Sequence, residues 1–193
     1  GETEPFDPFL MMDDFRNDDP SKYVKGFPWH PHRGIETITY VLKGNVQHSD
    51  SLGNNGILSD GDVQWMTAGS GIIHQEMPSG NELGQMHGFQ LWANLPKDQK
   101  MCTPRYLDIA SKEINTLTDD DGTHIRVIAG NYRGYRGVVD GIDTDPSYLD
   151  ITLMPNVKKR FPFDTRRQGF AYIFEGSANF GNSSLPFGVN VEK

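Results

Sequence analysis

The stretch Glu36-Thr37-Ile38-Thr39-Tyr40-Val41-Leu42 is rich in β-branched and aromatic residues and is followed closely by Gly44-Asn45. β-Branched and aromatic residues favour strands, whereas glycine and asparagine favour the turns that end them. Similar short stretches separated by turn residues recur at 63–66, 71–77, 88–95, 124–129, 148–154 and 170–176. Strands at this spacing are typical of antiparallel barrels and sandwiches. The sequence therefore predicts an all-β protein.

Composition excludes several classes of protein. The chain has 193 residues and a formal net charge of −8, which argues against a surface that binds nucleic acid through its phosphates. No apolar run approaches the roughly 20 residues of a membrane-spanning helix, and the first residues lack the pattern of a secretory signal. A single cysteine excludes an intrachain disulfide framework. We expect a cytoplasmic protein with no membrane partner, or one that is also nuclear if the source is eukaryotic.

The chain divides into three predicted parts. Residues 1–100 contain the densest strand signals and residues 101–123 form a predicted connector, which includes the acidic run at 119–121. Residues 124–193 form a second predicted unit. Its segment 170–176 resembles 39–44, because each is an apolar strand that ends on a charged residue and a glycine. This weak internal repeat indicates two related β-units.

Four residues with metal-binding side chains occur as two pairs, His30-Pro31-His32 and His74-Gln75-Glu76. Residues i and i+2 of a strand point to the same face, so each pair can present two ligands to one cavity. One H-x-H pair alone would more often be structural, but two such pairs beside glycine turns favour a metal site. Imidazole with one carboxylate suits a non-haem Fe(II)-type site, and also Mn, Ni, Cu or Zn.

Around these pairs the sequence resembles the pirins, a family of the cupin superfamily. The resemblance lies in segments 26–37 (GFPWHPHRGIET) and 61–78 (GDVQWMTAGSGIIHQEMP), with further matches at 6–10 and 87–95. It is dense from about residue 6 to 96 and thinner up to about 181. It implies a bicupin, in which two antiparallel β-barrels lie face to face and the N-terminal barrel holds one mononuclear metal ion, usually iron. By position, the implied ligands are His30, His32, His74 and Glu76.

Glu36 departs from the general cupin pattern, which leaves four residues between its second histidine and a ligand glutamate, whereas three residues lie between His32 and Glu36. Glu36 comes one residue too early, and a shift of one residue turns a side chain to the other face of a strand. We therefore expect Glu36 to point away from the metal and Glu76 to take over the carboxylate role. Among the other histidines, we expect His48 to be a strand residue with satisfied hydrogen bonds, His87 a hydrogen-bonded core residue and His124 structural.

The second unit contains no histidine after His124, so no second metal site is expected. Pirins are considerably longer than this chain, and we expect the C-terminal barrel to be incomplete here. Either the sequence is a fragment of a longer pirin, or a reduced second barrel takes its missing strands from a partner chain.

The resemblance implies two classes of function. In the first, the protein is a quercetin 2,3-dioxygenase-type oxygenase that cleaves a planar flavonol with O₂, and Glu76 accepts the substrate proton. In the second, it is a metal-dependent or redox-sensing protein without catalytic activity, which regulates transcription or metabolism by binding a protein partner. The ligand set is common to both, so the sequence does not decide between them.

Overall fold

The computed structural model describes residues 6–139, 146–164, 166–181 and 187–188 of the chain. It divides into a large unit that ends at Phe161 and a small unit that begins at Pro162. The large unit contains the candidate site and is described first.

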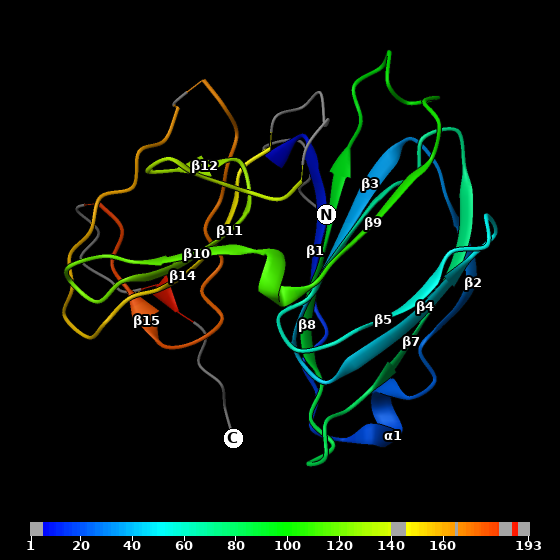
Figure 1. Ribbon diagram of the computed structural model, residues 1–193, viewed down its shortest axis with the longest axis horizontal. Coiled ribbons are helices and arrows are strands. Elements are labelled where there is room, and N and C mark those ends of the chain that lie inside the picture. The colour runs from blue at the N-terminus through cyan, green and yellow to red at the C-terminus, as the bar shows by residue number, and fades with distance from the viewer. Residues whose placement is uncertain (1–5, 140–145, 165, 182–186, 189–193) are drawn as a thin grey trace. The chain divides into compact units, whose positions relative to one another are not determined.

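Two antiparallel sheets form the first part of the large unit (Figure 1). The first has the strand order β1-β8-β3-β6-β9 and the second has the order β2-β7-β4-β5. The strands of the first sheet are β1 (Phe9–Asp14), β8 (His87–Asn94), β3 (Ile35–Lys43), β6 (Val63–Thr67) and β9 (Arg105–Ile109). Those of the second are β2 (Phe27–His32), β7 (Ile72–Ser79), β4 (Asn45–Asp50) and β5 (Asn55–Leu58).

Strand β3 is buried on both faces, in keeping with its β-branched and aromatic sequence. One face carries Thr39, which contacts residues of the second sheet across the barrel interior. The other face carries Tyr40, whose hydroxyl donates a 2.7 Å hydrogen bond to Asp150 on β14 (Tyr148–Thr152). Gly44 takes a φ of +90°, which L-residues with side chains rarely adopt, and so permits the turn from β3 into β4.

The barrel interior is polar in one layer and apolar in another. An apolar cluster of Val41, Val46, Leu58 and Met86 fills one region between the sheets. Beside it, the register places polar residues of the first sheet in one row across four strands: Gln90, Thr39, Gln64 and Asp108. The facing row of the second sheet contains Phe27, Glu76, His48 and Gly56. Hydrogen bonds join the two rows and bring the sheets together around the candidate site.

The remaining elements of the large unit are short. They are α1 (Pro20–Tyr23), η2 (Ser111–Glu113), β10 (Asn115–Thr118), β11 (His124–Ala129), β12 (Asn131–Tyr132) and β13 (Tyr135–Arg136). Strands β10, β11 and β14 form an antiparallel sheet with its own buried cluster around Ile125 and Val127. In the small unit, β15 (Ser177–Ala178) pairs with β16 (Phe187–Gly188).

The predicted fold class is confirmed, since the protein is all-β with antiparallel sheets. Among the described residues beyond 114, the sheets are small and no second barrel closes. The predicted boundaries at 100 and 123 stay a prediction; strand β9, inside the range predicted as a connector, pairs with β6 of the barrel.

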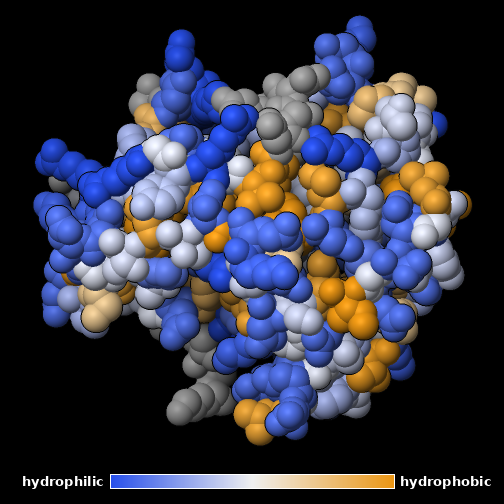
Figure 2. All heavy atoms as spheres, in the orientation of Figure 1, coloured by the Kyte–Doolittle hydropathy of each residue, from blue (hydrophilic) through white to orange (hydrophobic). Residues whose placement is uncertain are grey.

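None of the helices in the described part of the chain is long and apolar enough to cross a membrane. Hydrophilic residues cover much of the face shown in Figure 2, with smaller apolar areas between them.

Candidate metal centre

Three histidines of the second sheet converge on one point. The Nε2 atom of His30 lies 3.0 Å from Nε2 of His32 and 3.0 Å from Nε2 of His74. His30 and His32 come from β2, and His74 comes from the adjacent strand β7, where it is the register partner of His30. Together the three rings offer one ligand atom each, all within 4.8 Å of one another. They form the one group of this kind among the described residues.

The hydrogen bonding of His30 prepares its Nε2 atom to bind a cation. Its Nδ1 atom lies 2.8 Å from the carbonyl oxygen of Pro28, which can only accept. Nδ1 therefore carries the proton, and the lone pair of Nε2 points toward the other two histidines. A hydrogen bond from the distal ring nitrogen to a carbonyl is the usual way in which proteins fix the tautomer of a metal-binding histidine.

The other two rings are neutral at physiological pH. Burial, with a contribution from nearby His30, lowers the pKa of His32 to about 4. Burial likewise lowers the pKa of His74 to about 3, with His30 and His32 adding to the effect. Metal binding requires deprotonated imidazole, so the site does not have to expel protons from these rings to accept an ion. Three imidazoles at this spacing fit a divalent transition metal.

Glu76 lies on the same face of β7 as His74 and is buried, but its carboxylate is engaged elsewhere. It accepts hydrogen bonds from the Thr39 hydroxyl at 3.1 Å and from Gln90 Nε2 at 3.1 and 2.8 Å. Burial raises the pKa of Glu76, and the hydrogen bonds from Gln90 and Thr39 act in the opposite direction. Glu76 is not part of the three-histidine group, and its role as a metal ligand stays a prediction.

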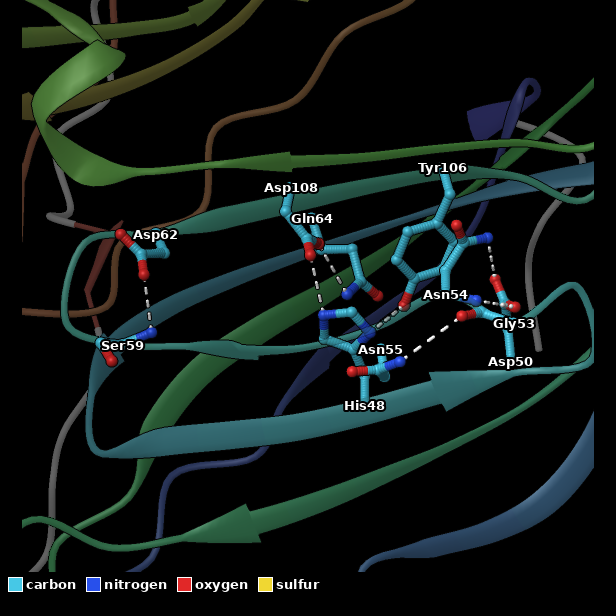
Figure 3. Close-up of polar contacts among 10 residues, drawn as sticks. All are labelled: His48, Asp50, Gly53, Asn54, Asn55, Ser59, Asp62, Gln64, Tyr106 and Asp108. Atoms are coloured by element: carbon cyan, nitrogen blue, oxygen red, sulfur yellow. Dashed lines mark hydrogen bonds and ion pairs between the residues drawn. The ribbon is translucent and has the colours of Figure 1, made fainter.

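A second polar network crosses the barrel one strand away from Glu76 (Figure 3). His48 is buried, with Nε2 at 2.9 Å from Asp108 and Nδ1 at 2.6 Å from the Tyr106 hydroxyl. An ionised carboxylate only accepts, so Nε2 donates to Asp108 and Nδ1 accepts from Tyr106. Gln64 donates to the other oxygen of Asp108 at 3.2 Å. The network links β4 to β9 and closes the barrel between the two sheets.

Space for this network depends on Gly56. A Cβ atom there would lie 2.6 Å from His48 Nε2 and 2.8 Å from Asp108 Oδ2. His48 is predicted from the sequence to be a strand residue with satisfied hydrogen bonds, and both of its ring nitrogens have partners.

The remaining candidate residues lie outside the three-histidine group. Glu36 is buried and accepts a 2.8 Å hydrogen bond from the Thr67 hydroxyl, and burial raises its pKa. His87 accepts a 3.1 Å hydrogen bond from Arg16 Nε. His124 is exposed and lies 3.0 Å from the Thr118 hydroxyl.

Three residues near the histidines and Glu76 were not predicted from the sequence: Thr39, Gln90 and Trp92. Trp92 contacts the His32 ring edge-to-face, with ring centroids 4.9 Å apart. Alternation along β8 puts Gln90 and Trp92 on one face, but only the pairing of β8 with β3 places that face toward the histidines.

A comparison with known families identifies the chain. The family model described as Pirin matches residues 1–93, which include all three histidines. A pirin-like protein of Caulobacter vibrioides is 40% identical over 185 residues, covering 95% of this chain and 67% of the relative. The chain belongs to the pirin family. The predicted family membership is thereby confirmed.

The pirin chain is shorter than the relatives it matches. It is 44% identical to the pirin-like protein At1g50590 of Arabidopsis thaliana over 182 residues, covering 93% of the chain but 57% of that relative. Among solved structures, quercetin 2,3-dioxygenase from Acinetobacter baumannii is similar, with a TM-score of 0.64 and 39% identity. The match covers 72% of this chain and 50% of the other.

Proposed function

We propose that this pirin is a metal-dependent dioxygenase of the quercetin 2,3-dioxygenase type, which cleaves a flavonol with O₂. The observation that carries the proposal is the convergence of three Nε2 atoms beside a buried carboxylate that is held by donors of the opposite sheet. The likeness to quercetin 2,3-dioxygenase from Acinetobacter baumannii supports it. Iron(II) is the metal we propose for the site, and Mn, Ni, Cu and Zn are the alternatives that imidazole ligands allow.

Access to the site is proposed from the side of β2, an edge strand of its sheet. His30 is only partly buried, and its neighbours Phe27 and Trp29 are exposed. Aromatic side chains on the strand that carries His30 suit a planar apolar ligand such as a flavonol. A small cavity lined in part by Phe27 and Thr39 also reaches Glu76.

Each residue has a defined part in the proposed reaction. His30, His32 and His74, with Glu76 as the carboxylate ligand, would hold the metal, which when bound would acidify and orient a flavonol hydroxyl. Glu76 accepts the proton of that hydroxyl at a carboxylate oxygen. Gln90 and Thr39 stabilise the carboxylate before the proton arrives, because both donate hydrogen bonds to it. The barrel wall excludes bulk water while O₂ opens the substrate ring and carbon monoxide leaves.

Anaerobic loading with iron(II), followed by quercetin and then air, tests the proposed function. We expect the flavonol absorbance to fall and carbon monoxide to appear in equal amount. The protein loaded in the same way but carrying His74→Ala is the control and should show neither change. If the loaded wild-type protein holds one metal ion and leaves quercetin intact, the proposed activity is wrong.

A further inference from the structure

The amide of Gln90 can take only one orientation in its surroundings. Its Oε1 atom accepts a 2.8 Å hydrogen bond from the indole Nε1 of Trp92, two residues along β8. An indole nitrogen is a donor and never an acceptor, so the oxygen end of the amide must face it. The opposite orientation would set N–H against N–H at Trp92 and oxygen against oxygen at Glu76.

With this orientation fixed, the amino end of Gln90 faces the carboxylate. Nε2 lies 2.8 Å from one oxygen of Glu76 and 3.1 Å from the other. It also lies 3.2 Å from the Thr39 hydroxyl, which in turn donates to Glu76. The donors all come from the first sheet, whereas Glu76 belongs to the second. The carboxylate is thus held from across the barrel, two residues from His74.

We propose that Gln90 is a positioning residue for the metal centre: its amide, oriented by Trp92, holds Glu76 as a hydrogen-bond acceptor beside the three histidines. This inference rests on the metal site of the proposed function. Trp92 reaches the site twice, since its indole N–H orients Gln90 while its ring packs against the His32 ring. Groups outside the ligand set that orient the ligands commonly change metal affinity by about 10- to 100-fold.

The chain offers a matched control in Gln64. Gln64 and Gln90 flank Thr39 in the same row, on the two neighbouring strands of β3. Both donate from Nε2 to a carboxylate, but Gln64 donates to Asp108 instead of Glu76. Replacing either with methionine removes an amide of the same size from the same layer of the barrel, where Gln64 is buried and Gln90 is half-buried. A loss of metal affinity that is caused by altered barrel packing alone would therefore follow either substitution.

Titration of the metal-free full chain with Co²⁺ tests the proposal, with affinity and the visible spectrum of the bound ion as readouts. We expect Gln90→Met to weaken Co²⁺ binding about 10-fold or more and to alter the spectrum, and Gln64→Met to do neither. Trp92→Phe should weaken binding in the same direction. The double variant Gln90→Met with Trp92→Phe should bind as Gln90→Met does, because phenylalanine keeps an aromatic ring beside His32 and loses only the indole N–H that orients Gln90.

Unchanged affinity and spectrum in Gln90→Met would overturn the proposal, as would an equal loss in Gln64→Met. Additive losses in the double variant would refute the role given to Trp92. If Gln90→Met does not fold, Gln90→Glu keeps the shape and the bond from Trp92 but replaces the donor with an acceptor, and should also weaken binding. Co²⁺ binding is measured without turnover, so a wild-type protein that binds the ion but leaves quercetin intact refutes only the proposed activity.

Discussion

His30 and His74 lie 44 residues apart in the chain, yet their Nε2 atoms are 3.0 Å apart. They are register partners on β2 and β7, so the pairing of these two strands creates the contact. The lone pair of His30 is directed inward by the hydrogen bond of its Nδ1 atom to Pro28. A site made this way should depend on every one of its imidazoles.

His74→Ala should abolish stoichiometric metal binding, since it removes the ring at the centre of the second sheet. We expect the affinity for Co²⁺ to fall by more than about 100-fold, beyond the range for groups that only support a ligand. Metal content after desalting and Co²⁺ titration measure the effect. His124→Ala is the control, because His124 is exposed on β11 and outside the histidine group. Equal metal content in the two variants would contradict the assignment.

Glu76→Gln should lower the rate of flavonol cleavage by about 10²- to 10⁴-fold, the usual contribution of a general base. The amide keeps the size of the side chain but cannot accept the substrate proton. Steady-state rates with the metal content measured in the same sample separate this effect from loss of the ion. A variant that retains both the metal and full turnover would show that Glu76 is not the base.

Glu36→Gln should stabilise the metal-free protein at pH 8, and the gain should shrink as the pH falls toward 4. Burial raises the pKa of Glu36 in the folded state, so ionisation of this carboxyl opposes folding at high pH. As the pH falls through the folded-state pKa, the carboxyl is protonated and the wild-type protein regains stability. Thermal unfolding at several pH values measures the difference. The variant should also retain bound metal; loss of the ion would mean that Glu36 reaches it.

Gly56→Ala should destabilise the barrel by about 1–3 kcal/mol, the usual cost of overpacking. The added methyl group would meet the His48 ring and the Asp108 carboxylate, so the strands β5, β4 and β9 would have to separate. Urea unfolding measures the cost. Combining Gly56→Ala with Asp108→Ala should lower the free energy of unfolding by less than the sum of the two single changes, because one of the two clashing groups is gone. Strict additivity would show that the clash is relieved elsewhere.

The sequence predicted each of the two i, i+2 pairs because the required information is local. Alternation along a strand places His30 with His32 and His74 with Glu76, whatever the rest of the fold does. The one-residue offset of Glu36 likewise predicts that its side chain lies on the face of β3 opposite to Thr39. In the structure Glu36 accepts a hydrogen bond from Thr67, whereas Thr39 donates to Glu76 at the candidate site.

The environment of Glu76 was beyond prediction because it depends on contacts between distant strands. The sequence indicates that Glu76 shares a face with His74, but not that Gln90 comes to rest against it. That contact depends on the register of β8 against β3 and on the distance between two sheets. The same holds for Asp108, which lies in a segment predicted as a connector but pairs with Gln64 on β6. Long-range register, unlike alternation, is decided by the packing of the whole barrel.

The three histidines belong to one sheet, and the donors that hold Glu76 belong to the other. In the proposed centre, the imidazoles that would hold the ion come from one sheet, and the groups that adjust its affinity and reactivity come from the other. Substitutions along β8 and β3 would then change both properties over many generations while the three histidines stay in place. Relatives with the same histidines could thus diverge between catalysis and other roles by changes in the facing sheet alone.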